Sequence, residues 1–324
     1  MPEEELNRGN APPDDPSPML ATLCNNPFFE EGWIYERKFD GERCLAVVRD
    51  GSVRLLSRNS VSLDASYPEI VAALEKQKLP DSVLDGEVVA FSGNVTSFSR
   101  LQGRMHISDP GEAKASNIAV HYYLFDLPFF DGVDLSGYPL KRRKAVLKAA
   151  CDYRHHIRFS AHRVRDGENY YREAAQKGWE GIMAKKADST YAHSRSPNWL
   201  KFKCARGQEF VIGGFTEPEG ERPGFGALLI GYHEGGELMY AGKVGTGYDD
   251  DFLRTFRKKM DALERKTSPF AHDEVPEEGV HFIRPELVAE VAFTEWTENN
   301  RLRHPRFKGL RRDKNPTDVV REDV

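Results

Sequence analysis

The sequence predicts an α+β protein of two domains, the first built of antiparallel sheets with helices and the second a small β-barrel. The chain has 324 residues, more than one core of ordinary size holds, so two domains are the default expectation. From Trp33 onward, short β-type runs alternate with helical stretches. After Cys204, strand-like runs separated by Gly-rich turns predict the barrel.

Residues 1–17 are expected to form a disordered leader, because this segment is acidic and rich in proline. It has neither the basic start nor the apolar core of a signal peptide. No apolar run approaches the roughly 18 residues that span a bilayer, so no membrane partner is expected. The four cysteines form no C-x-x-C pair, which argues against a zinc site or a disulfide framework and predicts a cytoplasmic location.

The first domain is expected over residues 18–207. Asp50-Gly51, between the runs CLAVVR and SVRLLS, is a strong signal for a two-residue hairpin. Ser66, with Glu69 three residues later, fits a capping box at the start of a helix. Further elements expected here are strands at WIYERK, VLDGEVVAF and IAVHYYLFDL, and helices over 139–150 and 168–177, the second ending at Gly178.

The second domain is expected over residues 208–318, followed by a short tail, 319–324. Its strand-like runs are EFVIGGFTE, GALLIGYH, ELMYAGKVG and LVAEVAFTEW, with one amphipathic helix over 250–265. About five strands with one inserted helix, in about 110 residues, predict a Greek-key barrel of the OB type.

The bases of the chain are clustered, although the net charge is −5. The leader alone contributes −4, from five acids and one base. Residues 137–165 hold nine Lys or Arg against one Asp, and residues 300–314 hold seven against one. Clustered bases on a near-neutral body are typical of a phosphate-binding surface. Solvated helix faces explain the first cluster equally well, whereas the second cluster shows no helical period.

Lys38 lies at the end of a predicted strand, beside Gly41 in the stretch YERKFDGERC. At a pKa of about 10.4, a lysine is a poor nucleophile at neutral pH. Burial and neighbouring cations lower that pKa, and Arg43 supplies a nearby cation. A surface hairpin with solvated charges is the alternative for this stretch taken alone.

Two further pairs of residues favour phosphoryl chemistry at this lysine. Glu87 in LDGEVV and Glu180 in WEGIMAKK supply carboxylates of the kind that hold Mg²⁺. Lys201 and Lys203 in WLKFK lie at alternate positions, and therefore on one face of a strand, where they would bind phosphate oxygens.

Six short motifs follow one another along the chain: K-x-D-G-x-R at Lys38–Arg43, SRN at 57–59, DGE at 85–87, FDL at 125–127, EGIMAKK at 180–186 and WLKFK at 199–203. In this order they resemble the motifs of the covalent nucleotidyltransferases, namely ATP-dependent DNA ligases, RNA ligases and mRNA capping enzymes. The runs PMLATL, KTSPF, RPELVAEVAFTEWT and RHPRFKGLRRDK are most similar to the ligase module of microbial non-homologous end-joining ligases of the ligase D type.

The resemblance covers residues 18–318. Ligase D enzymes often carry polymerase and phosphoesterase modules, for which this chain has no room, so a stand-alone ligase is expected. Arg312 departs from the family pattern, because the last motif often has an acid at this position.

The resemblance implies a nucleotidyltransferase domain of the ATP-grasp-like ligase type followed by an OB-fold domain. It also implies the activity of an ATP-dependent DNA ligase. By similarity, Lys38 attacks the α-phosphate of ATP and becomes lysyl-AMP. AMP then passes to the 5′-phosphate at a nick or break, and the 3′-hydroxyl displaces it.

Further roles follow from the same resemblance. Glu36 would accept a hydrogen bond from the adenine amino group, and Phe125 would stack on the base. Arg43 and Glu87 would hold the ribose, with Arg58 near the phosphate or the nick. Lys201 and Lys203 would bind the α-phosphate, with Arg195 close by, and Asp40 and Glu180 would bind Mg²⁺ or Mn²⁺. The OB domain would close about a hinge near Gly207. On closure, the residues that would orient the departing pyrophosphate are Arg303, Lys308, Arg311, Asp313 and Lys314.

The expected substrates are ATP and nicked or broken double-stranded DNA. A Ku-type end-binding protein and a separate repair polymerase are candidate partners. NAD⁺-dependent ligases are disfavoured, because they resemble a longer design with a four-cysteine zinc module that this chain lacks. An RNA-joining or capping enzyme and a non-catalytic OB-type nucleic-acid binder are the alternatives.

Overall fold

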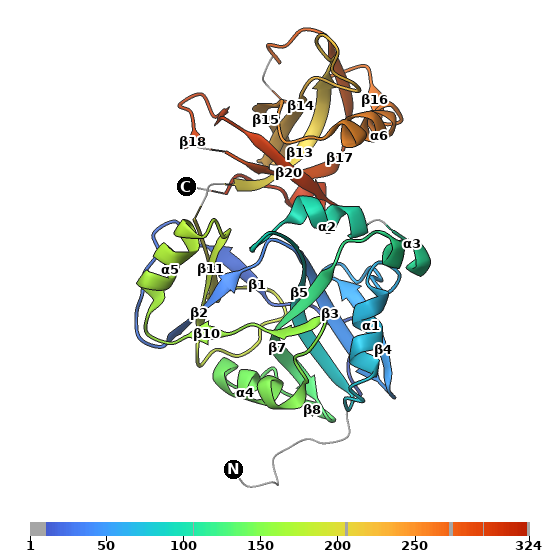
Figure 1. Cartoon of the computed structure of the whole chain (residues 1–324). Coiled ribbons are helices and arrows are strands. Elements are labelled where there is room, and N and C mark those ends of the chain that lie inside the picture. Colours follow the sequence, from blue (N-terminus) through green and yellow to red (C-terminus); the bar gives the residue numbers. More distant parts are fainter. Residues whose placement is uncertain (1–10, 106, 205–206, 272–274, 294, 323–324) are drawn as a thin grey trace. The chain divides into compact units, whose positions relative to one another are not determined.

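The structure of the chain is a computed structural model (Figure 1). It describes residues 11–105, 107–204, 207–271, 275–293 and 295–322. The chain divides into two compact units, Met1–Cys204 and Ala205–Val324. Within the described ranges, no helix is both long and apolar enough to cross a membrane.

Unit 1 contains two sheets in its described residues. The smaller sheet has the strand order β1-β12-β11-β2-β10, with bounds Leu20–Leu23, Arg195–Lys203, Gly181–Lys186, Trp33–Lys38 and His162–Arg163. The larger sheet has the order β4-β3-β5-β7-β8, with bounds Ser52–Ser57, Glu42–Arg49, Ser82–Ser92, Val120–Phe130 and Val133–Asp134. Two short strands extend it: β6 (Val95–Thr96) pairs with β5, and β9 (Ile157–Phe159) pairs with β7. Most neighbours are antiparallel, as the α+β prediction requires.

The helices of unit 1 are short and cover these sheets (Figure 1). They are α1 (Pro68–Glu75), α2 (Phe98–Met105), α3 (Pro110–Ala115), α4 (Leu140–Ala150) and α5 (Gly167–Gln176). Helix α4 packs on β7, and α5 packs on β11 and β2. The helices predicted over 139–150 and 168–177 are thereby confirmed within one residue of their bounds.

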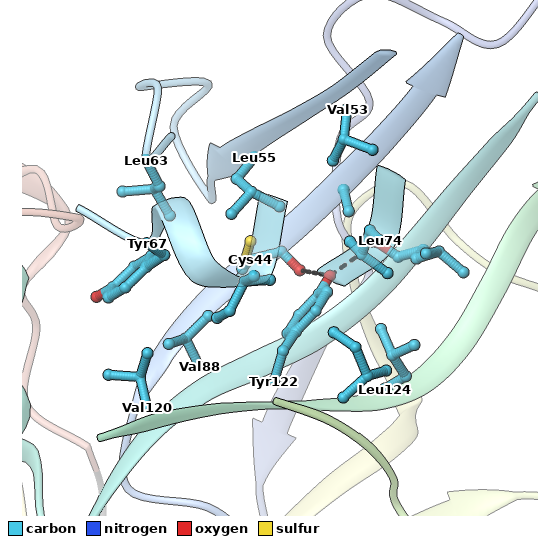
Figure 2. Close-up of a cluster of buried hydrophobic side chains, with 14 of the residues drawn as sticks. Cys44, Val53, Leu55, Leu63, Tyr67, Leu74, Val88, Val120, Tyr122 and Leu124 are labelled. Carbon is cyan, nitrogen blue, oxygen red and sulfur yellow. Dashed lines mark hydrogen bonds between the residues drawn. The ribbon is translucent and has the colours of Figure 1, made fainter. Parts of the chain in front are cut away.

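The largest core of unit 1 lies between α1 and the larger sheet (Figure 2). Tyr122 is fully buried in this core, and its hydroxyl donates to the backbone oxygens of Cys44 (2.8 Å) and Leu84 (3.1 Å). A buried tyrosine is stable in an apolar core when its hydroxyl finds such acceptors. These two bonds tie β7 to β3 and β5, the strands that carry several predicted site residues.

The hairpin predicted at Asp50-Gly51 is confirmed. Arg49 pairs with Ser52, so the turn between β3 and β4 has two residues. Both have positive φ, 50° and 80°, as a type I′ turn requires. Gly178 just beyond α5 also has positive φ, 66°, as expected for a residue that ends a helix.

The capping box predicted at Ser66 and Glu69 is wrong. Helix α1 begins at Pro68, and Tyr67 precedes it without a side-chain cap. The Ser66 hydroxyl donates instead to the Ile107 backbone oxygen (2.9 Å), and Glu69 pairs with Arg104 (2.8 Å). Arg104 is almost fully buried and needs a carboxylate partner, so this tertiary contact replaces the local cap.

Of the leader predicted to be disordered over 1–17, the structure describes residues 11–17, whereas residues 1–10 lie outside the described residues. Arg49 contacts the backbone oxygen of Pro12 and pairs with Asp14 (2.6 Å), while Arg54 donates to the Asp14 backbone oxygen (2.6 Å). Pro12 is buried. Two arginines of the β3–β4 hairpin therefore hold this segment, a contact that composition does not reveal.

Unit 2 is an OB-like unit, as predicted. Its sheet has the order β15-β14-β13-β17-β16, and β20 pairs with β17; a separate pair joins β18 and β19. Helix α6 (Asp250–Asp261) ends four residues before the predicted end, because β16 begins at Glu264. The strand bounds are Gly207–Thr216 for β13, Leu228–Glu234 for β14, Glu237–Val244 for β15, Glu264–Arg265 for β16, Val280–Ala292 for β17, Glu295–Trp296 for β18, Leu302–Arg303 for β19 and Arg306–Arg311 for β20, followed by a 3-10 turn at Pro316–Asp318.

Candidate active site

Two cross-strand rows of the smaller sheet organise the site around Lys38. Lys38 of β2, Gly181 of β11 and Lys203 of β12 are direct neighbours across the three strands. Two residues along, Glu36, Met183 and Lys201 form the next row. Because side chains alternate along a strand, both rows present their side chains to one face of the sheet. The strand register thus collects residues from three separate motifs.

Lys38 makes an ion pair with Glu180, the residue that precedes β11. Burial alone would raise the pKa of the Glu180 carboxyl, but Lys38, Lys203 and Lys201 outweigh it and hold that pKa below its ordinary value. Three lysines therefore surround one carboxylate. The arrangement places a nucleophilic amine within a cationic field suited to phosphate oxygens.

Gly181 is required between the two lysines of the first row. Its φ is 152°, and a Cβ atom here would lie 2.1 Å from the Phe202 backbone oxygen. Gly41, beside Lys38, is as crowded: a Cβ would lie 2.3 Å from the Val88 backbone oxygen. The glycines of both motifs thus permit close backbone packing around the site.

Arg43 is fixed by a buried carboxylate that the sequence interpretation did not select. Asp85 is fully buried and accepts two hydrogen bonds from Arg43, at 2.5 and 2.6 Å. Tyr191 donates to the same carboxylate (2.7 Å). Burial would lower the Arg43 pKa, but Asp85 outweighs it and raises the pKa. Since Asp85 balances the Arg43 charge, Arg43 is a weaker influence on Lys38 than the sequence suggested.

Arg43, Glu87 and Tyr123 form a row across β3, β5 and β7 in the larger sheet. Phe125, two residues after Tyr123, lies on the same face and is 7% exposed. The Arg43 guanidinium carbon lies 4.6 Å from the Phe125 ring centroid, and Lys185 Nζ of the smaller sheet lies 4.1 Å from it. The two sheets therefore meet at Phe125, where cations cover the ring that was expected to stack on adenine.

Glu36 is held between two buried lysines. Lys144 Nζ lies 2.6 Å from Oε1, and Lys185 Nζ lies 3.0 Å from Oε2. Ser160 also donates to Oε2 (3.1 Å). Burial would raise the Glu36 pKa, but the two lysines outweigh it and lower the pKa. Glu36 is therefore a charged acceptor deep in the unit.

Three other predicted residues are placed differently. The Asp40 carboxylate accepts from the Phe98 backbone N–H at the start of α2 (3.3 Å). Arg195 lies at the opposite end of β12 from Lys203, and it donates to the Ala21 backbone oxygen (2.5 Å). Arg58, just beyond β4, is half exposed. Asp40 thus has a visible structural role, whatever else it binds.

The predicted residues of the last motif fall into two groups within unit 2. Arg311 donates to both carboxylate oxygens of Asp313, at 2.8 and 2.7 Å, and lies 3.6 Å from Glu290. Lys314 pairs with Glu209 (2.8 Å). In contrast, Arg303 and Lys308 are exposed, and Arg303 pairs with Glu295 (2.6 Å). Arg311, Asp313 and Lys314 therefore hold the barrel together, in addition to any part in chemistry.

The basic cluster over 137–165 is a weaker surface patch than its charge count suggested. Arg143 and Lys144 are buried, with Asp126 and Glu36 as partners. Others of the cluster have acidic partners that are exposed or half-buried: Lys141 pairs with Asp188, Arg154 with Asp152, and Arg163 with Asp166 and Glu173. Charge counted along the chain thus overstates the charge that this segment presents to a ligand.

Sequence reasoning missed Asp85, Lys144 and Lys185. Asp85 and Lys185 lie inside motifs that were recognised, DGE and EGIMAKK. Lys144 was counted among surface bases, yet a signal was present: the buried residues of α4 are Leu140, Arg143, Lys144 and Leu147. This spacing is that of one helix face, and leucines mark it as the buried face.

No metal is part of this structure, so the fit of the predicted ligands rests on the carboxylates alone. Among the described residues, no group of three or more His, Cys, Asp or Glu side chains is arranged to hold an ion. Mg²⁺ is commonly bound by one or two carboxylates together with substrate phosphates, so Glu180 beside Lys38 suits such an ion. Asp40 fits less directly, because its carboxylate already accepts from α2.

The fold and the lysine-centred site define a ligase of the nucleotidyltransferase type, with an OB-like unit after the nucleotidyltransferase unit. The chain belongs to the ATP-dependent DNA ligase family: residues 18–203 match the model for the ATP dependent DNA ligase domain. Residues 221–314 match the model for the ATP dependent DNA ligase C terminal region.

Curated relatives include two multifunctional non-homologous end joining proteins named LigD. The protein of Pseudomonas aeruginosa is 37% identical over 314 residues, which cover 94% of this chain and 36% of the relative. The protein of Mycobacterium tuberculosis H37Rv is 36% identical over 318 residues, which cover 95% of this chain and 40% of the relative. This chain therefore spans about two fifths of the length of these relatives.

Solved structures of ligase domains match over nearly the whole chain. A mycobacterial DNA ligase D complexed with ATP and MES has a TM-score of 0.71 and 34% identity, covering 95% of this chain and 99% of that one. The ligase domain of M. tuberculosis LigD has a TM-score of 0.52 and 35% identity, with the same coverage. The chain is thus homologous to the ligase domain of LigD proteins.

Proposed function

We propose that this chain seals nicks and breaks in double-stranded DNA through a lysyl-AMP intermediate on Lys38. One observation carries the proposal: Lys38 contacts Glu180 and lies in one row with Lys203, beside Lys201. An amine, a carboxylate and two further cations meet at one place, which is the set that attack at a triphosphate requires.

In the proposed first step, the neutral Lys38 amine attacks the α-phosphorus of ATP. A P–N bond forms, the bond to the bridging oxygen breaks, and pyrophosphate leaves with its electron pair. Lys38 begins as a cation paired with Glu180, so one proton must be lost to solvent before the attack, and the nitrogen loses a second proton to solvent as the phosphoramidate forms. Mg²⁺ or Mn²⁺ held by Glu180 and Asp40 would supply positive charge that weakens this ion pair and balances the triphosphate.

In the second step, an oxygen of the DNA 5′-phosphate attacks the phosphorus of lysyl-AMP, a P–O–P bond forms and the P–N bond breaks, and Lys38 takes up a proton from solvent to become the amine again. The 3′-hydroxyl then attacks this activated phosphate, a phosphodiester bond forms and AMP leaves. We assign Lys201 and Lys203 to the α-phosphate, Glu36 and Phe125 to adenine, and Arg43 and Glu87 to the ribose. Arg58 and Arg195 are assigned to phosphates of the nucleotide or the nick, and Arg303, Lys308, Arg311, Asp313 and Lys314 to pyrophosphate.

We further propose a role in double-strand break repair, on the basis of the relatives named as end-joining proteins. A Ku-type end-binding protein and a repair polymerase are the proposed partners. The four cysteines are free thiols, which supports a reducing, cytoplasmic location.

Sealing of a nicked duplex tests this function, with and without a ribonucleotide at the 3′ side. The protein should seal the DNA nick only when ATP is present. Lys38→Ala should not seal it with ATP, yet should seal a nick that is supplied already adenylylated. Lys186→Ala is the matched control, an exposed lysine of β11, and should seal normally. Sealing by Lys38→Ala with ATP, or sealing of RNA nicks alone, would contradict the proposal.

A further inference from the structure

Lys144 is an uncommon side chain, a lysine with 1% exposure in the middle of a short helix. Its Nζ lies 3.2 Å from the Phe125 backbone oxygen and 3.1 Å from the Ser160 backbone oxygen, and it donates to both. The third neighbour is Glu36 Oε1, at 2.6 Å. An ammonium group has three N–H donors, so the two carbonyls fix where this charge sits.

Lys185 approaches Glu36 differently. Its Nζ is 3.0 Å from Oε2, and it lies over the rings of Trp199 (3.9 Å) and Phe125 (4.1 Å). No backbone carbonyl is recorded for this ammonium group among the described contacts, and its support is largely aromatic. Lys144 is therefore the backbone-anchored partner of the carboxylate, and Lys185 is the partner held by rings.

Glu36 is more strongly compensated than packing alone requires. Two buried cations face one buried anion, although apolar side chains of similar volume would fill this space at less cost. Oε2 accepts from Lys185 and Ser160. Oε1 lies 2.6 Å from Lys144 Nζ, and no other hydrogen-bond donor reaches this buried oxygen among the described residues. A charged oxygen with an unused lone pair is prepared to accept one further N–H donor.

We propose that Lys144 is a positioning residue that holds Glu36 as a charged acceptor for the exocyclic amino group of a 6-aminopurine, and so sets the preference for ATP over a nucleotide that lacks this group. The inference rests on the proposed function, in which Glu36 faces the adenine. Without Lys144, the carboxylate can turn toward Lys185 or take up a proton. It then no longer distinguishes a purine that carries the 6-amino group from one that lacks it. Lys144 touches neither nucleotide nor reacting atoms in this account; it acts through Glu36.

The test compares ATP with purine riboside triphosphate, which has hydrogen in place of the 6-amino group. The measured quantity is kcat/KM for formation of the covalent enzyme–nucleoside monophosphate adduct with each nucleotide. A hydrogen bond to a charged group corresponds to a preference for ATP of roughly 10- to 100-fold in the wild-type protein. Lys144→Met should reduce this ratio about tenfold, mainly by raising KM for ATP, while the rate with purine riboside triphosphate changes little.

Lys144→Gln is a second variant that guards against misfolding. Its amide can still donate to the carbonyls of Phe125 and Ser160, but it carries no charge, so the same loss of selectivity is expected. Lys148→Met is the matched control, an exposed lysine one turn further along α4, and should keep the wild-type ratio. If the role of Lys144 were purely structural, its replacement would lower kcat/KM for adduct formation by the same factor with both nucleotides.

The possible outcomes distinguish a failure of the Lys144 inference from a failure of the proposed ligase function. If the wild-type protein forms no adduct with either nucleotide, the proposed function fails. If it forms the adduct but does not prefer ATP, or if both Lys144 variants keep the wild-type ratio, the function stands and the role of Lys144 is overturned.

Discussion

The charged residues of the two units differ in what surrounds them. In unit 1, charged side chains are buried against a specific partner, as Arg143 is with Asp126, where both side chains are 0% exposed. In unit 2, the charges of the last motif form a network at the surface of the barrel, where Arg311 is 17% exposed and Lys308 is exposed. The comparison teaches that burial, more than the type of residue, decides whether a motif residue supports the fold, the chemistry or both.

The largest expected effect is in unit 1, at Arg143. Its guanidinium is fully buried and makes two 2.8 Å bonds to Asp126, which is also fully buried. Arg143→Met leaves this carboxylate buried without its hydrogen-bonded cation, so the free energy of unfolding should fall by about 3–5 kcal/mol. Chemical denaturation measures the loss. Lys141→Met removes an exposed pair on the same helix, with Asp188, and should change stability by less than about 0.5 kcal/mol. Equal losses in the two variants would refute the comparison.

A smaller effect is expected in unit 2, at Arg311. Arg311→Met leaves Asp313 and Glu290 without their shared cation, but the Arg311 and Glu290 side chains are 17% and 14% exposed. The expected loss is roughly 1–3 kcal/mol, below that of Arg143→Met. Lys308→Met should leave stability unchanged, and if the segment acts on pyrophosphate it should still slow adduct formation. A stability loss in Lys308→Met that matches Arg311→Met would show that the two groups are not distinct.

The contact between Lys38 and Glu180 predicts a pH dependence of the order of 1 kcal/mol. The folded-state pKa of Glu180 lies below its ordinary value, so the pair stabilises the fold above that ordinary value. This contribution is lost as the pH falls through the folded-state pKa. Lys38→Ala should therefore be less stable than the wild type near pH 7, and the difference should shrink below about pH 4.5. A difference that stays constant with pH would contradict the assignment.

The smallest effect is expected where the N-terminal segment meets the β3–β4 hairpin. Asp14 and Arg49 are 69% and 37% exposed in their side chains, so the pair is largely solvated. Asp14→Asn should lower the free energy of unfolding by no more than about 0.5 kcal/mol. Urea denaturation of both proteins in low salt measures the difference. A loss above about 2 kcal/mol would mean that this exposed pair behaves like the buried pairs of unit 1.

Local signals predicted much of the fold. The runs around Asp50-Gly51 and Gly178 carry their own turn chemistry, so the hairpin and the end of α5 follow from a few adjacent residues. Ser66 misled for the opposite reason: its environment is set by Ile107 and by the buried Arg104, which are distant in sequence. Tertiary contacts of this kind have no local signature.

The site shows the same division. Motif order identified Lys38 and Glu180, but the register between strands brings them into contact. Register depends on the pairing of strands from different motifs, so no single motif predicts it. Lys144 illustrates what a count of charges hides. From its residue type, Lys144 is expected on the surface. Only its spacing from Leu140 and Leu147 indicates that it lies on the buried face of α4.

Intact-mass spectrometry tests the central claim most directly, namely that Lys38 is the residue that accepts AMP. Mixed with ATP and Mg²⁺, the wild-type protein should gain about 329 Da, the mass of one AMP less water, and peptide mapping should place it on Lys38. Lys38→Ala should gain nothing, and neither should Lys38→Arg, because a guanidinium stays protonated and is no nucleophile. Lys186→Ala should gain the full mass. A mass gain that persists in Lys38→Ala, or that maps to another lysine such as Lys185, would contradict the account.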